Sequence, residues 1–116
     1  MNILNQQKIK ELAGEIGEEN VPVLLDIFLG ELKMYIDSLS SGSLPDVPQY
    51  LAEISHALKS SAASFGADKL CGYAHDIDAR VKSKKNIDEV EDTLEILAIL
   101  KETQVEYLAL LNQLQA

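Results

Sequence analysis

Cysteine is the scarcest chemically important residue in this sequence. Cys71 is the only one among 116 residues, so an intrachain disulfide is impossible and a cysteine-based structural zinc site is excluded. No apolar run approaches the ~20 residues that span a bilayer, and residues 1–8 lack the basic and apolar pattern of a secretory signal. We therefore expect an unprocessed protein that stays in the reducing cytoplasm.

Positive charge is also in short supply. The chain has 10 basic against 19 acidic residues and a formal net charge of −9. Because a nucleic-acid binder needs a basic face and an anionic membrane would repel this surface, we expect neither partner. A chain of this length with 47% hydrophobic residues can bury one core, and we expect a single domain over residues 1–116.

Helix-breaking residues are few. Proline and glycine occur three and six times, and strand-like alternation of apolar and polar residues is absent. The apolar spacing of three and four residues predicts helices instead, with Gly66 ending one of them in a left-handed conformation and a loop over residues 40–48. This is an all-α fold, an antiparallel four-helix bundle with an additional short N-terminal helix. The predicted helices cover about residues 9–16, 20–40, 50–65 and 68–85, with a long last helix after Asn86, and Asn20 is a candidate cap for the second of them.

The second predicted helix has apolar residues on two sides, and two apolar faces need two neighbours. One stripe is expected to enter the bundle. The second consists of Val23, Ile27 and Met34; we expect the first helix to cover it, and otherwise part of it is exposed for a partner. Gly30 lies on that side, where a closely packed backbone would explain a residue that costs roughly 1 kcal/mol of helix propensity.

The end of the fourth predicted helix is strongly basic. Cations suit the negative end of a helix dipole, which is the simpler interpretation; the alternative is that they attract an acidic partner. Beyond them, Asn86 and Glu89 have the spacing of a capping box at the start of the last helix. The basic residues are Arg80, Lys82, Lys84 and Lys85.

The residues around His56 are the best candidates for chemistry. The apolar residues of this helix form one stripe, and at roughly 100° per residue His56 points about 160° away from its centre, toward solvent. Its nearest neighbours on the helix surface are Ala52, Lys59, Ser60 and Ala63. Three of these are small, which lets another macromolecule approach, and Lys59 places a cation where an anionic group on the ring would lie. The arrangement indicates a docking place for a phosphoryl group.

These residues carry a resemblance to a known family. Residues 56–67 (HALKSSAASFGA) resemble the His-x-Leu-Lys-Gly-x-x-x-x-x-Gly signature of histidine-containing phosphotransfer (HPt) domains, with Ser60 in place of the first glycine. The longer runs 20–31 (NVPVLLDIFLGE) and 53–68 (EISHALKSSAASFGAD) are similar to small, free-standing HPt proteins of bacterial quorum-sensing relays. Likeness in length and helix order spans nearly the whole chain.

The resemblance implies a phosphotransfer intermediate rather than an autonomous enzyme. His56 would carry a phosphoryl group from the receiver domain of a hybrid sensor kinase to that of a downstream response regulator, in a quorum-sensing relay. Lys59 would stabilise the phosphoryl oxygens. Ser60 and Ala63 would shape access to the site, and Ala52 would leave room for the partner. The protein would be a monomer without a cofactor of its own, and Mg²⁺ would belong to the partner receiver domain.

Two other kinds of protein are compatible with these residues. Glu53 and His56 have the Glu-x-x-His spacing of metal-binding four-helix bundles, but Gly72 stands three residues before His75, so the second copy is missing and we predict no metal site. A helical adaptor without phosphotransfer could instead use the second apolar stripe. An adaptor would keep its activity when His56 is replaced with glutamine. A relay protein would lose phosphate transfer completely while its fold is preserved.

His75 is the other histidine and serves as an internal comparison. It also points away from the apolar stripe of its helix. Asp78 stands three residues on, where His56 has Lys59, and Asp76 is adjacent. Because these anions would repel a phosphoryl group, we predict that His75 is an ordinary surface residue.

Overall fold

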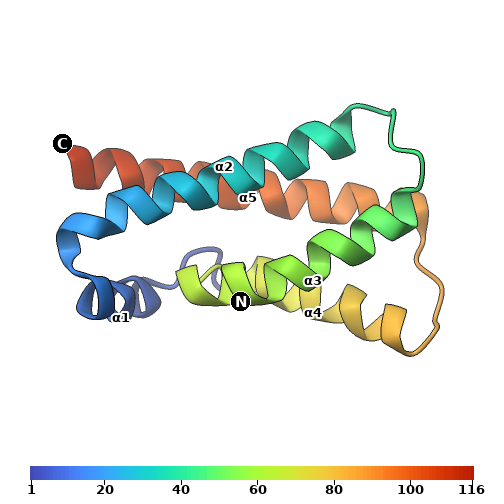
Figure 1. The fold of residues 1–116 in the computed structure, drawn as a ribbon, viewed down its shortest axis with the longest axis horizontal. Helices are drawn as coiled ribbons and strands as arrows, with labels where there is room; N and C mark the ends of the chain where they lie inside the picture. Colours follow the sequence, from blue (N-terminus) through green and yellow to red (C-terminus); the bar gives the residue numbers. More distant parts are fainter.

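The chain folds as an antiparallel four-helix bundle with a short helix at its N-terminus, as the sequence predicts (Figure 1). The computed structural model describes residues 1–116 and contains no strand. A 3-10 turn, Glu18–Asn20, joins the first two helices. None of the helices combines the length and apolarity that crossing a bilayer requires. The helices are α1 (Gln6–Ile16), α2 (Val21–Ser40), α3 (Val47–Phe65), α4 (Asp68–Lys82) and α5 (Glu89–Gln115).

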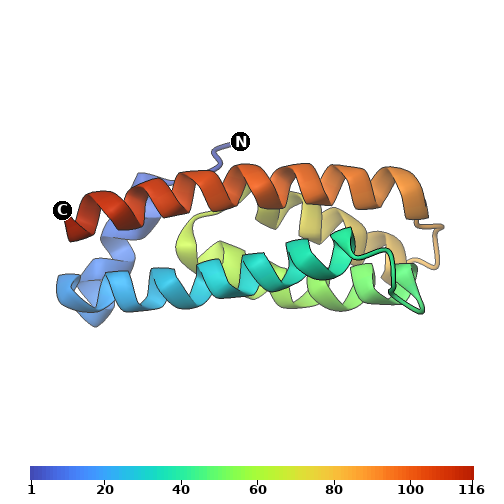
Figure 2. The ribbon, with the colours of Figure 1, turned by 90° about the horizontal axis from the view of Figure 1, so that it is seen from above.

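Two pairs of helices build the bundle. α2 lies beside α5, and α3 lies beside α4, each pair running antiparallel (Figure 1 and Figure 2). The apolar stripes of these helices meet in a core of 22 buried residues, each large one worth roughly 1.5–3 kcal/mol relative to exposure. At one end of this core the Phe28 ring stacks on that of Phe65 at 4.6 Å and meets the ring of Tyr107 edge-on at 5.2 Å. These rings join α3 to α2 and α5.

The turn between α3 and α4 also anchors the N-terminal segment. Gly66 takes the left-handed conformation predicted for it, and its carbonyl accepts the backbone N–H of Asn5 at 2.8 Å. A Cβ at this position would lie 2.7 Å from Lys8 Cβ and 2.9 Å from the carbonyl oxygen of Asn5, so contact as well as conformation requires glycine. The side chain of Asn5 caps α1 and donates to Asp68 at 3.0 Å. α1 is fixed in this way against the end of α3.

Two helix starts differ from the prediction. Asn20 does not cap α2, because its backbone is already helical, and its side chain donates to the carbonyl of Ile16 at 2.6 Å. The capping box of Asn86 and Glu89 is also wrong. Asp88 caps α5 instead, and its carboxylate accepts two backbone N–H groups of the first turn. A carboxylate is favoured there because it also interacts with the positive end of the helix dipole.

The outward faces of α2 and α5 carry exposed apolar residues. Val23, Ile27 and Met34 are 59%, 64% and 56% exposed, so the expectation that the first helix covers the second stripe is wrong. α1 packs instead against the 3-10 turn and the end of α3. Nothing lies within 4 Å of a Cβ placed on Gly30, so no close backbone explains that glycine. Exposed apolar residues of α5 include Val90, Leu94, Val105 and Leu108.

Candidate functional site

His56 lies in the middle of α3, on the side that faces away from the core. The helix begins at Val47, within the predicted loop of residues 40–48, because the carboxylate of Asp46 caps its first turn. From that start, the spacing of the apolar residues turns Leu58 fully into the core, while the side chain of His56 is 73% exposed. The predicted presentation of the imidazole to solvent is confirmed.

A carboxylate from α4 faces the imidazole. Asp78 Oδ1 lies 3.5 Å from His56 Nδ1, and Asp78 Oδ2 binds the Nζ atoms of Lys59 at 2.7 Å and Lys82 at 2.8 Å. The aspartate is only 7% exposed, because α3 and α4 pack closely. Lys59 is therefore not an isolated cation. Side chains from two helices form one cluster, which we call the Asp78 cluster: His56, Lys59, Asp78 and Lys82.

Sequence reasoning placed Asp78 beside the wrong histidine. Along α4 it stands one turn after His75, but its side chain points across to α3, and His75 is exposed without an ion pair to it. The prediction that Asp78 would repel a phosphoryl group from His75 is therefore wrong. A signal was present, since Asp78 follows the buried Ala74 by four residues and so falls on the inner side of α4. An acidic residue at such a position calls for a partner on the facing helix.

The two lysines keep Asp78 ionised. Hydrogen bonding with Lys59, followed by Lys82, holds the pKa of the Asp78 carboxyl far below its usual value, against the opposing effect of burial. Asp78 in turn raises the pKa of the Lys82 ammonium. A carboxylate facing Nδ1 of His56 favours the neutral tautomer with its proton on that nitrogen. Nε2 is then the basic nitrogen, and it has no hydrogen-bond partner within the protein.

Small side chains surround the ring, as the sequence predicts. Ser60 and Ala63 are exposed and Ala52 is half-buried. The hydroxyl of Ser60 makes no hydrogen bond within the protein, while its backbone carbonyl accepts the hydroxyl of Ser64 at 3.1 Å. A partner can therefore approach the imidazole closely and meet a free hydroxyl beside it. The roles of these three residues remain predictions.

Other chemistries find less support in the structure. No group of three or more His, Cys, Asp or Glu side chains is arranged to hold a metal ion. The carboxylate of Glu53, the first residue of the Glu-x-x-His pair, accepts a hydrogen bond from Gln49 at 3.1 Å. Burial, with a smaller contribution from Asp68, raises the pKa of the Cys71 thiol, so little thiolate is present to act as a nucleophile.

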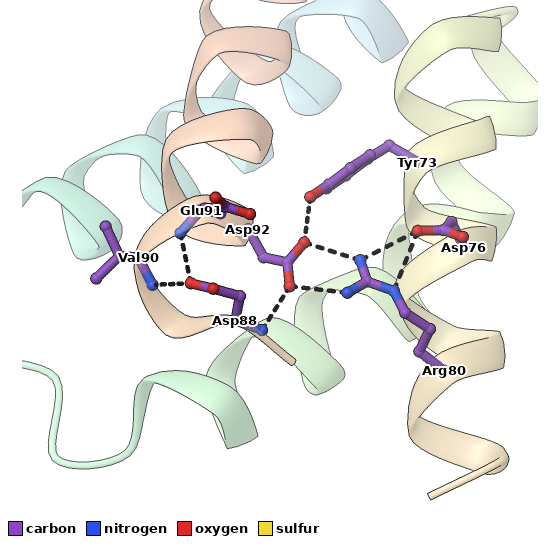
Figure 3. Close-up of polar contacts among 7 residues, drawn as sticks. All are labelled: Tyr73, Asp76, Arg80, Asp88, Val90, Glu91 and Asp92. Atoms are coloured by element: carbon purple, nitrogen blue, oxygen red, sulfur yellow. Dashed lines mark hydrogen bonds and ion pairs between the residues drawn. The ribbon is translucent and has the colours of Figure 1, made fainter. Parts of the chain in front are cut away.

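A buried ion pair fixes the end of α4. Arg80 donates two hydrogen bonds to the carboxylate of Asp92 at 2.8 and 2.9 Å (Figure 3). The same carboxylate accepts the Tyr73 hydroxyl at 2.6 Å and the backbone N–H of Asp88 at 2.8 Å. Arg80 also pairs with Asp76 at 3.0 Å. Arg80 therefore joins α4 to the start of α5, close to the residues that face His56. Neither interpretation of the basic residues at the end of α4 included this contact.

Comparison with known proteins gives matches over most of the chain. The model of the Hpt domain family matches residues 23–116. The phosphorelay protein LuxU of Vibrio harveyi is 54% identical over 106 residues, which cover 91% of this chain and 93% of that protein. LuxU of Vibrio cholerae is 59% identical over 97 residues, which cover 81% and 86%. The crystal structure of histidine-containing phosphotransfer protein B from Pseudomonas aeruginosa superposes with a TM-score of 0.72 at 21% identity, covers 96% and 92% of the two chains, and supports the fold.

Proposed function

The chain belongs to the Hpt domain family, and from this premise we propose that His56 carries a phosphoryl group between two proteins of a phosphorelay. The donor is the receiver domain of a hybrid sensor kinase, and the acceptor is the receiver domain of a response regulator. The observation that supports this most directly is an exposed imidazole whose Nδ1 faces an ionised carboxylate. The LuxU relatives are phosphorelay proteins by name, which supports the same function.

The proposed reaction is an exchange between an acyl phosphate and a phosphoramidate. Nε2 of His56 attacks the phosphorus, the bond from phosphorus to the receiver aspartate oxygen breaks, and the aspartate regains its carboxylate. The proton on Nδ1 stays there, facing the Asp78 carboxylate 3.5 Å away, so the ring becomes a phosphorylated imidazolium without any separate general base. The reverse exchange passes the group to the second receiver. Catalysis of this kind depends on positioning and on charge stabilisation of the phosphoryl oxygens.

The cations of the Asp78 cluster fit this reaction. Lys59 and Lys82 share one carboxylate oxygen, so either ammonium can turn to an incoming phosphoryl group while the other keeps Asp78 ionised. The remaining machinery, an acceptor aspartate and Mg²⁺, belongs to the partner, and the protein needs no cofactor of its own. We further propose a cytoplasmic monomer that serves a quorum-sensing relay, in keeping with the LuxU relatives.

Transfer of a ³²P-labelled phosphoryl group tests the proposal. The purified chain is incubated with a receiver domain carrying a ³²P acyl phosphate, and the label is then mapped. We expect an acid-labile, alkali-stable label on His56, and we expect this label to be transferred to a second receiver domain when one is added. Label that is stable to acid, or that maps to a peptide lacking His56, would contradict the proposal.

Replacing Lys59 with alanine should slow transfer without unfolding the domain. The variant removes one of the two cations beside the phosphoryl group and leaves Asp78 paired with Lys82 alone. We expect the rate of transfer from a phosphorylated receiver to fall by roughly 10²-fold, the usual effect of one electrostatic donor. Single-turnover kinetics measure this, and Lys33→Ala, on α2, is the matched control. An unchanged rate would remove Lys59 from the site.

A bulky residue at Ala63 should block docking. Ala63 is exposed and lies two turns beyond His56 on the same face of α3, so an indole there would stand in the path of a partner. We expect Ala63→Trp to weaken receiver binding at least tenfold in a titration monitored by calorimetry. Ala98→Trp, at an exposed position of α5, should bind normally. Equal affinities for the two variants would show that the partner docks elsewhere.

A helical adaptor is the second candidate function. The exposed stripe of Val23, Ile27 and Met34 on α2 favours it, because contiguous apolar surface often marks a protein interface. Such an adaptor would need the stripe and not the imidazole. Replacing His56 would therefore abolish the phosphotransfer function and leave the adaptor function intact.

A further inference from the structure

A polar groove lies beside His56, between the start of α3 and the end of α4. It encloses about 450 Å³. Ala52 and the first turn of α3 form one wall, and Val81, Lys84 and Lys85 form the other. Because Ala52 lies one helical turn before His56 on the same face, the groove reaches to within about one helical turn of the imidazole.

The backbone holds Lys84 and Lys85 in place at the edge of this groove. Lys84 has a φ of 57°, the left-handed conformation that ends many helices. The N–H of Lys85 donates to the carbonyl of Arg80 at 2.8 Å, which closes the helix end. The two ammonium groups are therefore displayed from an ordered turn rather than from a flexible tail.

Lys84 and Lys85 differ from Arg80 and Lys82, the other two basic residues at the end of α4. Arg80 is held by Asp92 and Asp76, and Lys82 is held by Asp78. Lys84 and Lys85 are exposed and make no ion pair. Only one carboxylate lines the groove, that of Asp46, which caps α3 through the N–H of Gln49, so the two ammonium groups outnumber the negative charge there. On a chain of net charge −9, the groove is a local site of unbalanced positive charge.

We propose that Lys84 and Lys85 dock the acidic rim of the receiver domain while His56 exchanges the phosphoryl group. This inference rests on the proposed function. A pocket that binds Mg²⁺ beside an acceptor aspartate is built from carboxylates, since Mg²⁺ prefers oxygen ligands. That pocket must face His56 during transfer, which brings its rim over the adjacent groove. The rest of this acidic chain repels the same rim, so the two lysines also orient the encounter.

The test compares two double variants that each remove two positive charges. Lys84→Gln with Lys85→Gln removes both positive charges from the groove, whereas Lys33→Gln with Lys101→Gln removes two positive charges from α2 and α5, the layer that does not carry His56. The rate of transfer from a ³²P-labelled receiver domain is measured at low and high salt. We expect the groove variant to lose roughly tenfold at low salt and much less at high salt, and the control to change little. Lys84→Arg with Lys85→Arg should transfer normally.

Three results would contradict the docking proposal or the proposed function. Equal rates for the groove and control variants would overturn the docking proposal, because overall charge would then explain any loss. A loss in the groove variant that salt does not diminish would overturn it as well, since charge would not be the cause. If the unaltered protein accepts no label from any receiver, the proposed function itself fails. Circular dichroism of each variant checks that the bundle stays folded.

Discussion

Replacing His56 with glutamine should abolish phosphoryl transfer and leave the bundle intact. Glutamine is close in size and polar, but its amide has no lone-pair nitrogen that can attack phosphorus. The side chain is 73% exposed, so the free energy of unfolding should change by less than about 0.5 kcal/mol. Incubation with a labelled receiver, followed by urea unfolding of the same preparation, measures both quantities.

The matched control is His75→Gln on α4. His75 is also an exposed histidine on a helix surface, but it makes no ion pair and is not part of the Asp78 cluster. We expect this variant to take up label at the normal rate. A His56 variant that still carried phosphate would rule out the relay chemistry at this position. A variant that lost phosphate and yet supported signalling in a cell would favour the adaptor.

The fold could be predicted because its signals are local. Gly66 is an example, since a glycine that follows an apolar helix and precedes another helix start is a common helix end, and the structure has it there with a φ of 77°. The number and order of the helices follow in the same way from apolar spacing, although α1 and α3 begin about three residues earlier than predicted and α4 ends about three residues earlier. What the sequence does not reveal is that Gly66 also receives the N-terminal segment, because Asn5 is 61 residues away along the chain and joins it only in the folded state.

The buried face of a helix was harder to predict where apolar residues lie on two sides. Along α5, Leu94, Val105 and Leu108 also recur with helical spacing, yet they are exposed, and Ile96 and Leu100 are among the residues that enter the core. Periodicity identifies each stripe but not which one meets the neighbouring helices. The same ambiguity explains the wrong neighbour assigned to the second stripe of α2. Only the packing of whole helices decides between such faces.

The candidate site was predicted in part for a related reason. His56 and its small neighbours all lie on one helix, so their spacing was enough to bring them together. Asp78 and Lys82 come from α4, and their contacts with His56 and Lys59 depend on the antiparallel packing of α3 and α4. Residues on a single helix can be placed by counting, whereas contacts between helices require their register.

Asp92→Ala should produce the largest loss of stability among single changes to the polar network. The variant leaves the guanidinium of Arg80, which is 25% exposed, without its bidentate partner, and it removes the acceptor for the Tyr73 hydroxyl and the Asp88 N–H. Breaking a buried pair from one side costs about 3 kcal/mol. We expect urea unfolding at pH 7 to show a loss of this size. Asp76→Ala removes the exposed partner of Arg80 and should cost less than about 1 kcal/mol.

The pH dependence of stability separates the charge of Asp92 from its packing. Hydrogen bonding from Arg80, the largest effect, lowers the pKa of the Asp92 carboxyl in the folded state. Its contribution is therefore fully present above the unfolded pKa of about 4 and is lost as the pH falls from there through the lowered folded pKa. The stability difference between the unaltered protein and Asp92→Asn should accordingly shrink as the pH falls below about 4. A difference that stayed constant over this range would mean that Asp92 acts through shape alone and that its ionised form does not stabilise the junction of α4 and α5.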